Sequence, residues 1–263
     1  MKFIGTNVIV TGAGGGIGKA VAKDLYSLGA NVILFDLDKE ALIKAKKEIE
    51  KNKNNNVENT LNYYEIDITD SQKVKYAVAQ ISKDYHKIDI LINAAGIISS
   101  FPLSELEEKE WDRVINVNLK GTFLVSKYVL EVMTNKKSGK IVNIGSDLSY
   151  LGQKMLSHYV TSKHGILGFT RSIALEYAEY GILVNAVCPG PTETPLHYKD
   201  IEMQIQYSGL SKAEHLGREL KNIPLGKLGK PEEVSKAILF LVSDENTHIT
   251  GAALDVNGGL AMH

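Results

Sequence analysis

The sequence predicts a doubly wound α/β fold, with helices on both faces of a seven-stranded parallel sheet. Seven short apolar, largely β-branched runs recur along the chain, and several are apolar on both sides, as in strands that are covered on both faces. Amphipathic stretches lie between these runs, and such alternation is typical of parallel strands joined by right-handed crossovers. The composition, 44% hydrophobic and 23% charged, is globular. It shows no break, so a single domain over residues 1–263 is expected.

Each apolar run is assigned to a strand and each amphipathic stretch to a helix. The expected strands are residues 8–10, 32–35, 63–66, 88–92, 141–144, 183–187 and 252–256. The expected helices are residues 19–28, 39–53, 71–85, 105–135, 153–178 and 231–242. In two of these helices, 39–53 and 71–85, apolar residues are interspersed among charges, as on a surface helix with one buried face.

Two helix starts carry local signals. Ser104 with Glu107 fits a capping box ahead of the long helix. Pro231, followed by two glutamates, suits the first turn of the last helix, because proline is tolerated there and acids favour the positive end of the helix dipole. The segment 192–225 is different, since it is polar, weakly periodic and without a strand, and we expect it to be an excursion over the sheet.

Charge and composition exclude several classes of function. The 30 basic and 31 acidic side chains give a formal net charge of -1, which argues against nucleic-acid binding and against an anionic-membrane surface. No apolar run approaches the ~18 residues of a membrane span. The N-terminal residues lack the apolar core of a secretory signal, so a cytoplasmic protein is expected. The single cysteine forbids an internal disulfide, and no histidine has metal-ligand spacing, so no metal site is expected.

A glycine-rich turn, TGAGGGIG at residues 11–18, joins the first predicted strand to the first helix. Glycines let the backbone approach a pyrophosphate closely, and the helix N-terminus supplies oriented N–H groups and a positive potential. Gly12, Gly16 and Gly18, with Ile17 between them, are the candidate pyrophosphate residues. A flexible turn is the alternative. The strand before, the helix after and an acid downstream favour a dinucleotide site.

That acid is Asp36, which would accept hydrogen bonds from the adenosine ribose hydroxyls. The 2′-phosphate of NADP would meet this carboxylate, and two unit charges ~4 Å apart at an effective dielectric of ~20 repel by ~4 kcal/mol, about a thousandfold in affinity. Leu37 and Gly15 offer no basic side chain to bind that phosphate, so NAD is the predicted cofactor. A strand-end turn role is the alternative for Asp36. Asp67 and its neighbour Ile68 are candidates at the adenine edge, and a helix-capping or turn role for Asp67 stays open.

Tyr159 and Lys163 lie four residues apart in a stretch with helical character, so the phenol and the ammonium share one face. Acid–base work near neutral pH requires the tyrosine pKa to fall by ~3 units from ~10. An ammonium ~5 Å away at a dielectric of ~20 supplies ~3 of the ~4 kcal/mol that this needs. The positive ring of oxidised nicotinamide could supply the rest. Alone, the pair is a weak signal, because many such pairs are surface neighbours.

Further motifs accompany the pair in a set order: NAAG at residues 93–96, NVNL at 116–119, Ser146 thirteen positions before Tyr159, and Pro189-Gly190. Together with the glycine turn, they make essentially the whole chain resemble the short-chain dehydrogenase/reductase family. The resemblance implies a single-domain Rossmann fold. It also implies an oxidoreductase that transfers a hydride between nicotinamide and a secondary alcohol or ketone.

The resemblance implies a role for each matching position. Tyr159 would exchange a proton with the substrate oxygen, Lys163 would lower the pKa of that phenol and bond the nicotinamide ribose, and Ser146 would hold the substrate oxygen. Asn118 would anchor a water that links Lys163 to solvent. The resemblance also implies three sets of cofactor contacts. Asn93, Ala94 and Gly96 would support the central strand beside the adenosine. Pro189 and Gly190 would shape the loop over the nicotinamide, and Thr192 would bond its carboxamide or phosphate.

Two positions depart from the family pattern. Gly145 stands where the family often has serine, and glycine should be harmless there. The NAAG motif has an alanine where a second asparagine is common, which removes one amide from the support of the strand. Neither departure touches the expected proton path.

The expected substrate pocket is walled by residues after Ser146, around Gln153, Met155 and His158, and by residues 192–225, which would form a lid ordered by binding. His158 is expected at a solvated helix position, with a place facing the substrate as the alternative. The single cysteine, Cys188, is expected to behave as a small buried apolar group. A hydroxy acid, a polyol and an alicyclic alcohol all stay open as substrates.

Three functions are weighed. The first is an NAD(H)-dependent oxidoreductase of a secondary alcohol or ketone, and the second is a 3-oxoacyl-[acyl-carrier-protein] reductase-like enzyme that uses NADPH. The third is a non-catalytic NAD-binding regulatory protein, whose signature would be a replaced tyrosine or lysine, whereas both are present. The resemblance implies a homotetramer formed through the two long helices, and a monomer would leave apolar helix surface in water.

Overall fold

The computed structural model describes residues 2–53 and 57–262. Within that part of the chain, seven strands form one sheet in the order β3-β2-β1-β4-β5-β6-β7, and each neighbouring pair is parallel. The predicted doubly wound sheet is therefore confirmed. The strands are β1 (Asn7–Thr11), β2 (Asn31–Asp36), β3 (Leu61–Glu65), β4 (Ile90–Asn93), β5 (Gly139–Ile144), β6 (Ile182–Pro189) and β7 (Ala253–Val256).

The order of the strands reverses between β1 and β4, which pair from Val8 with Ile90 to Thr11 with Asn93. The chain winds outward from β1 to β3 on one side and from β4 to β7 on the other. Because all strands are parallel, their carboxyl ends meet at one edge of the sheet. In open α/β sheets, ligands bind outside this edge at the reversal.

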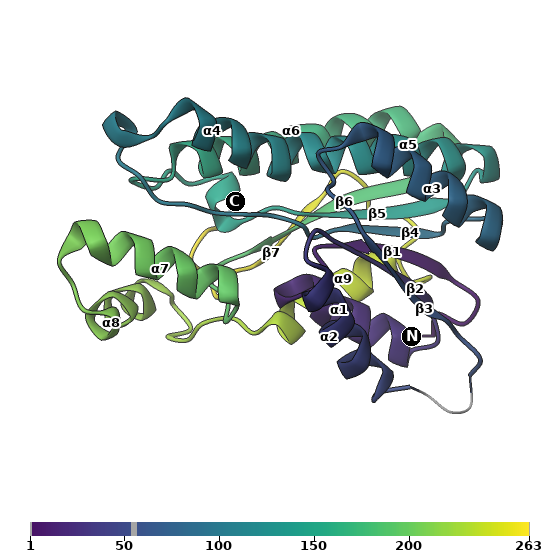
Figure 1. Ribbon diagram of the computed structural model, residues 1–263, viewed down its shortest axis with the longest axis horizontal. Coiled ribbons are helices and arrows are strands. Elements are labelled where there is room, and N and C mark those ends of the chain that lie inside the picture. Colours follow the sequence, from purple (N-terminus) through teal and green to yellow (C-terminus); the bar gives the residue numbers. More distant parts are fainter. Residues whose placement is uncertain (1, 54–56, 263) are drawn as a thin grey trace.

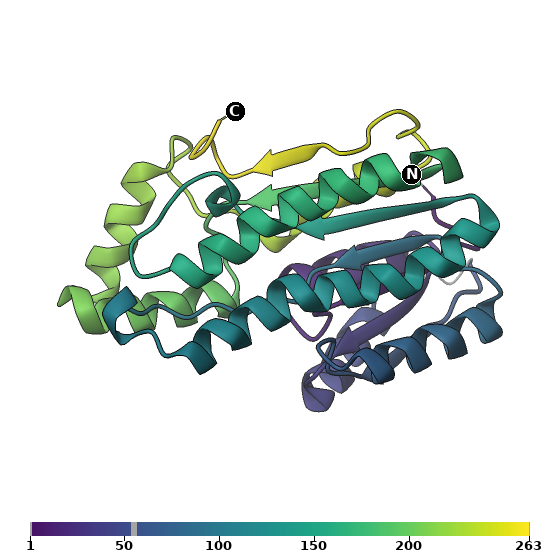
Figure 2. The ribbon, with the colours of Figure 1, turned by 90° about the horizontal axis from the view of Figure 1, so that it is seen from above.

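Helices cover both faces of the sheet (Figure 1). One face carries α1 (Gly16–Ser27), α2 (Lys39–Glu50) and α9 (Pro231–Val242), and the other carries α3 (Ser71–Tyr85), α4 (Glu108–Ile115), α5 (Thr122–Lys136) and α6 (Ser157–Tyr177). Successive strand residues point to opposite faces. Val8 and Val10 therefore join the core that packs against α1 and α9, while Ile9 joins the core under α3 and α5. Figure 2 shows α5 and α6 side by side over the sheet.

The helix expected over residues 105–135 is interrupted. A 3₁₀ turn, η1 (Leu103–Glu105), precedes α4, and a π-helical turn, η2 (Asn116–Gly121), joins α4 to α5. The predicted capping box is wrong. Ser104 lies inside the 3₁₀ turn, which the Glu105 N–H closes on the Pro102 carbonyl at 2.9 Å, and Glu107 precedes α4 without a side-chain capping bond.

The segment 192–225 is mainly helical, with α7 (Pro195–Ser208) and α8 (Lys212–Asn222), which lie beyond the carboxyl edge of the sheet (Figure 1). Thr194 caps α7, Gly209 ends it with a φ of 67°, and a capping box at Ser211 and Glu214 starts α8. These caps set the two helices although the hydrophobic periodicity is weak, which is why the sequence pattern underestimates them. The segment contributes an isolated bridge, from Thr192 to Gly229, and no named strand among the described residues.

α6 begins at Ser157 rather than at residue 153, after a left-handed residue, Met155 with a φ of 67°. Gln153 therefore lies in the loop before the helix and is exposed. Short 3₁₀ turns flank this region, η3 (Asp147–Ser149) after β5 and η4 (Ala178–Tyr180) after α6. Over residues 2–53 and 57–262, no helix combines the length and the apolar character that crossing a membrane demands.

Candidate active site

A cavity of about 350 Å³ opens at the carboxyl edge of the sheet, between the strand ends and the helices α6, α7 and α8. Many of the predicted site residues line it: Gly12, Gly16, Ile17, Gly18, Asp36, Ala94, Gly96, Ser146, Gln153, Tyr159, Lys163, Pro189, Gly190 and Thr192. Four others are absent from the described lining: Asp67, Ile68, Asn93 and Asn118. The cavity therefore joins the glycine turn to the tyrosine–lysine pair in one space.

The glycine turn is packed against the strand end, with backbone next to backbone. Gly12 has a φ of +65°, and a Cβ there would lie 2.7 Å from the Ala95 nitrogen, so glycine is required. Gly15 is the N-cap of α1, and no side chain in the described part of the chain caps that helix end. A Cβ at Gly15 would meet nothing within 4 Å. The uncapped N–H groups at a glycine-lined cavity wall fit an anionic pyrophosphate.

Asp36, at the end of β2, holds the turn in place. Its Oδ2 accepts a hydrogen bond from the Gly14 N–H at 2.9 Å, and its Oδ1 accepts one from the Asp38 N–H at 3.1 Å. The turn role left open by the sequence is therefore real. Asp36 also lines the cavity, so both readings of this carboxylate are compatible.

Ser146 and Tyr159 meet in the buried part of the cavity, 7% and 8% exposed. Ser146 follows β5 and caps the 3₁₀ turn, accepting the Leu148 N–H at 3.1 Å while its hydroxyl donates to Asp147 Oδ1 at 2.8 Å. A hydrogen bond links Ser146 to the Tyr159 phenol. The two hydroxyls are thus adjacent, as a substrate oxygen shared between them requires.

Lys163 lies one turn along α6 and is 6% exposed. Its Nζ donates to the Ile144 carbonyl at 2.8 Å and stands 5.6 Å from the centroid of the Tyr159 ring. Burial lowers the pKa of this ammonium to about 8. The predicted i, i+4 pairing on one helix face is therefore present, with the ammonium fixed by the end of β5.

Known proteins are similar to this chain in sequence and fold. The family model described as short chain dehydrogenase matches residues 6–204. The chain belongs to this family. It is 39% identical to the 3-oxoacyl-[acyl-carrier-protein] reductase FabG of Thermotoga maritima over 100% of both chains. It is 36% identical to the NAD-dependent glycerol dehydrogenase of Listeria innocua, over 97% of this chain and 93% of that one. The crystal structure of NAD+-bound xylitol dehydrogenase is 30% identical, with a TM-score of 0.93 over 98% of this chain and 100% of that chain.

Membership makes this protein an oxidoreductase that acts on CH–OH groups and binds a nicotinamide cofactor. Several effects act on the pKa of the Tyr159 phenol. Burial raises the pKa of the Tyr159 phenol, the negative charge of Asp147 raises it further, and the hydrogen bond with Ser146 lowers it. The Lys163 ammonium donates to the Ile144 carbonyl at 2.8 Å, and its effect on the phenol pKa with the cofactor bound stays a prediction.

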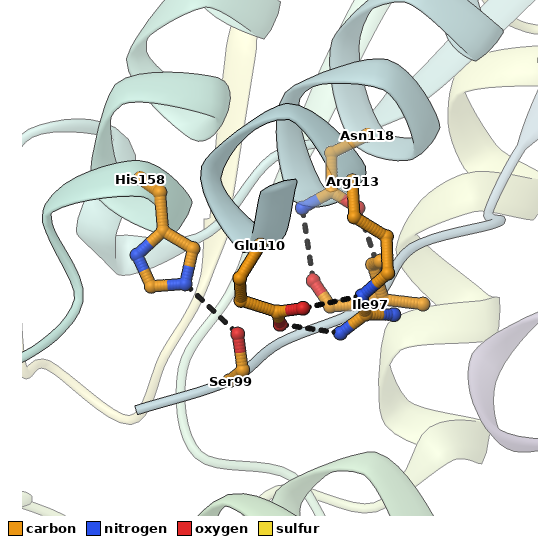
Figure 3. A network of polar contacts seen from close by, with 6 residues as sticks. All are labelled: Ile97, Ser99, Glu110, Arg113, Asn118 and His158. Carbon is orange, nitrogen blue, oxygen red and sulfur yellow. Dashed lines mark hydrogen bonds and ion pairs between the residues drawn. The ribbon is translucent and has the colours of Figure 1, made fainter. Parts of the chain in front are cut away.

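Asn118 acts on the backbone rather than on the cavity. Its side chain accepts the Ile97 N–H at 2.8 Å and donates to the Ile97 carbonyl at 3.0 Å (Figure 3). It also donates to Ser162 Oγ at 3.1 Å. The π-helical turn places it there. It thereby fixes the loop after β4 against α6, one residue from Lys163, with both amide hydrogens in use. The water link expected at Asn118 stays a prediction.

Three further cofactor candidates, Asn93, Asp67 and Ile68, also lie outside the described cavity lining. Asn93 is buried in a polar ladder and donates to Ser126 Oγ at 2.9 Å and to Asn143 Oδ1 at 2.8 Å. Asp67 accepts the Thr69 N–H and hydroxyl at 2.8 and 2.7 Å, which is the turn role left open above. Ile68, 7% exposed, packs in the core under α3 and α5.

The loop after β6 is held by its own contacts. Thr192 is 5% exposed and its hydroxyl donates to the Gly190 carbonyl at 2.8 Å. A Cβ at Gly190 would lie 2.9 Å from the Asn257 Cα, so this loop and the end of β7 approach as closely as glycine allows. Glycine was expected to be harmless at position 145. The structure adds that a larger residue would be crowded there, since a Cβ at Gly145 would lie 2.8 Å from Cys188 Sγ.

His158 is buried, 0% exposed, so the expectation of a solvated position is wrong. Its Nε2 lies 2.9 Å from Ser99 Oγ, and Ser99 also reaches Glu110 of α4, which forms a bidentate pair with Arg113 (Figure 3). Burial lowers the pKa of His158. The cause is the packing of α4 on α6, which covers this helix face and which residue pattern alone does not reveal. His158 is outside the described cavity lining.

The sequence analysis named the residues after Ser146 and the segment 192–225 as pocket wall, but it assigned no role to the acids within them. Asp147, Asp200 and Glu219 line the cavity, together with His197, whose Nε2 lies 3.1 Å from Glu219 Oε2. Asp147 adjoins Ser146 in sequence, and that adjacency was the available signal. The others belong to α7 and α8, far from any motif, so only the tertiary structure brings them to the site.

Proposed function

We propose that this short-chain dehydrogenase is an NAD(H)-dependent oxidoreductase that interconverts a secondary alcohol and a ketone, with a hydroxy acid, a polyol or an alicyclic alcohol as substrate. The observation that supports it most is the single cavity that holds the glycine turn and Asp36 at one end and Ser146, Tyr159 and Lys163 at the other. A dinucleotide spanning this cavity would bring its reactive ring to the tyrosine.

The chain's own residues would then carry out the proton chemistry. Ser146 holds the substrate oxygen, and Tyr159 takes its proton during oxidation or returns it during reduction. Lys163, whose pKa burial lowers to about 8, would bond the nicotinamide ribose and exchange a proton with the phenol. The cofactor, when bound, supplies or accepts the hydride. Gly12, the N-terminus of α1 and the loop from Pro189 to Thr192 would hold it.

NAD is preferred in this proposal because Asp36 faces the cavity as a carboxylate whose two oxygens are fixed by backbone N–H groups. A 2′-phosphate would meet a negative charge that cannot turn away. Leu37, the next residue, is 67% exposed and brings no positive charge.

The first prediction concerns this preference. The catalytic efficiency kcat/KM with NADH should exceed that with NADPH by about a thousandfold, as expected for two like charges at ~4 Å. Asp36→Ala should reduce the ratio by at least tenfold. Steady-state kinetics with one ketone and both cofactors measure it, and Asp38→Ala, a neighbouring exposed acid, is the control. An NADPH preference in the native protein would refute this reading of Asp36.

The second candidate is a 3-oxoacyl-[acyl-carrier-protein] reductase-like enzyme that uses NADPH, and the 39% identity to the Thermotoga maritima FabG favours it. It is distinguished by assaying acetoacetyl thioesters with NADPH and NADH against simple alcohols with NAD. Efficient reduction of the thioester with NADPH alone would make this candidate the better one.

A non-catalytic NAD-binding regulatory protein is the remote alternative. An intact fold that binds NAD and turns over no secondary alcohol or ketone would favour it. Against it stand Tyr159 and Lys163, both present and adjacent in the cavity.

The proposal extends to the surroundings of the site. The segment 192–225 would act as a lid over the substrate, since its helices contribute cavity wall. Assembly into a homotetramer through α5 and α6 is supported by Phe123, which is 42% exposed on α5 and packs edge-on against Phe169 of α6. A cytoplasmic location remains part of the proposal, as predicted from the sequence.

A further inference from the structure

The substrate end of the cavity is walled by acids. Asp147 follows the catalytic serine, Asp200 lies on α7 and Glu219 on α8. Both aspartates are 7% exposed, and the Glu219 side chain is 21% exposed. Three carboxylates from three separate elements therefore converge on the space beside the reacting phenol.

The three acids line one cavity, and electrostatic effects between them accompany this. Apart from the desolvation that dominates both shifts, Glu219 raises the pKa of Asp147 and of Asp200. Asp147 and Asp200 in turn raise the pKa of the Tyr159 phenol. Charges influence one another in this way only across a short, poorly hydrated gap.

Positive charge does not balance this wall. Among the described lining residues, the basic side chains are Lys163 and His197. The Lys163 ammonium donates to the Ile144 carbonyl beneath Tyr159, and His197 Nε2 lies against Glu219 at 3.1 Å. A carboxylate on a substrate would thus enter without a cationic partner. At ~6 Å and an effective dielectric of ~20, a single like charge disfavours it by about a hundredfold.

The wall also carries hydrogen-bonding groups other than carboxylates. The Gln153 amide lies in it, and the His197 imidazole stands beside Glu219. Each Asp200 oxygen already accepts a hydrogen bond, from Ser100 at 2.5 Å and from Gln204 at 2.7 Å, and each retains a further lone pair. Hydroxyl groups both donate and accept, so they match a wall that mixes acceptors with amide and imidazole groups. An ammonium only donates.

We infer that the substrate is an uncharged polyhydroxylated molecule, a polyol or a sugar, whose hydroxyls beside the reacting carbon bind the wall of Asp147, Asp200 and Glu219. The inference rests on the proposed function and narrows it, since it removes hydroxy acids and simple alicyclic alcohols from the substrates considered. The carboxylates serve as hydroxyl acceptors for recognition, and Ser146 and Tyr159 keep their roles at the reacting oxygen.

The test is a matched panel assayed with NAD: glycerol and xylitol, their acids glycerate and xylonate, the amine 3-amino-1,2-propanediol, and cyclohexanol. The expected result is a kcat/KM for each polyol at least a hundredfold above that of its acid, and above those of the amine and cyclohexanol. A hydroxy acid, the amine or cyclohexanol turned over as well as the polyols would overturn the inference while the proposed function stood. No turnover of any of them, with NAD still bound, would instead remove the proposed function.

A charge-neutral variant tests the wall itself. Glu219→Gln should lower the ratio of polyol to hydroxy-acid efficiency about tenfold, because one like charge leaves the site while the helix is kept. Glu202→Gln on α7 is the matched control, since Glu202 is exposed, outside the described lining, and pairs with Lys212 at 3.1 Å. That control should leave the ratio within twofold. NAD affinity and the thermal midpoint show that both variants are folded, and an unchanged ratio in Glu219→Gln would contradict the proposal.

Discussion

Tyr159 is 8% exposed and has a hydroxyl on one side, an ammonium under its ring and a carboxylate nearby. A buried phenol in this setting holds its proton firmly, so the reaction depends on its immediate neighbours. The proton chemistry therefore depends on single side chains, and substitutions of Tyr159 and Asp147 test this.

Tyr159→Phe removes a single oxygen and keeps the ring that packs on Leu148 and Leu156. We expect kcat to fall by about 10²–10⁴-fold, the usual contribution of general acid–base catalysis. The dissociation constant of NAD should stay within about threefold, because the glycine turn is untouched. Steady-state kinetics and a fluorescence titration measure the two quantities. Activity near that of the native protein would remove the assigned proton role.

Asp147→Asn should move the pH dependence of alcohol oxidation. The phenolate is the form that accepts the substrate proton, so the rate rises as the pH increases through the phenol pKa. The Asp147 charge raises that pKa, and its removal lowers it. The alkaline rise of kcat/KM should therefore shift to lower pH by about one unit, as a unit charge at ~10 Å implies at a dielectric of ~20. Glu202→Gln serves as control, and a profile that stays in place would show that Asp147 does not act on the phenol.

At the scale of elements, close approaches between strand ends shape the site. A Cβ at Gly145 would lie 2.8 Å from Cys188 Sγ and 3.1 Å from Ser149 Oγ, so β5, β6 and the 3₁₀ turn leave room for a hydrogen alone. The burial of Cys188 at 0% exposure agrees with its expected behaviour as a small apolar group.

Gly145→Ser should lower the free energy of unfolding by about 1–3 kcal/mol, the usual cost of overpacking. Cys188→Ala should recover part of this loss in the double variant, because it vacates the space that the new side chain needs. Denaturant unfolding of the two single variants and the double variant measures the coupling. Strictly additive losses would mean that the two positions do not share a space.

Strong periodicity explains why most strands and helices were predictable. The caps that build α7 and α8 act locally at Thr194, Gly209 and Ser211, and they override a weak hydrophobic pattern. The π-helical turn at Asn118 depends on Ile97, twenty-one residues earlier, so no local pattern encodes it. His158 misled for a related reason, since α4 buries it from another part of the chain.

Over the whole molecule, the motif residues of the site were predictable because they sit at the carboxyl ends of strands or on one helix face. Asp200 and Glu219 lie in the predicted wall segment 192–225, but the packing of α7 and α8 decides which side chains of that segment reach the cavity. The rise in the pKa of the Tyr159 phenol was also not predictable, because it is caused by burial, which is a property of the folded molecule.

The whole-molecule prediction is the assembly. The native protein should sediment as a tetramer, and Phe123→Glu should yield smaller species, because the ring pair with Phe169 lies on the outer side of α5 and α6. Lys44→Glu on the exposed side of α2 is the control and should leave the mass unchanged. Analytical ultracentrifugation measures both. A monomeric native protein would refute the predicted tetramer.

The hydrogen bond from Ser100, in the loop after β4, to Asp200 on α7 joins the two sides of the cavity. On one side of it lie Ser146, which follows β5, and Tyr159 and Lys163 of α6; on the other lie α7 and α8, which line another part of the cavity. The proposed catalytic residues and the proposed recognition acids Asp200 and Glu219 thus belong to separate elements. Replacement of α7 and α8 by the corresponding helices of another dehydrogenase, with the Asp200–Ser100 hydrogen bond kept, would change the substrates accepted while Ser146, Tyr159 and Lys163 stayed in place.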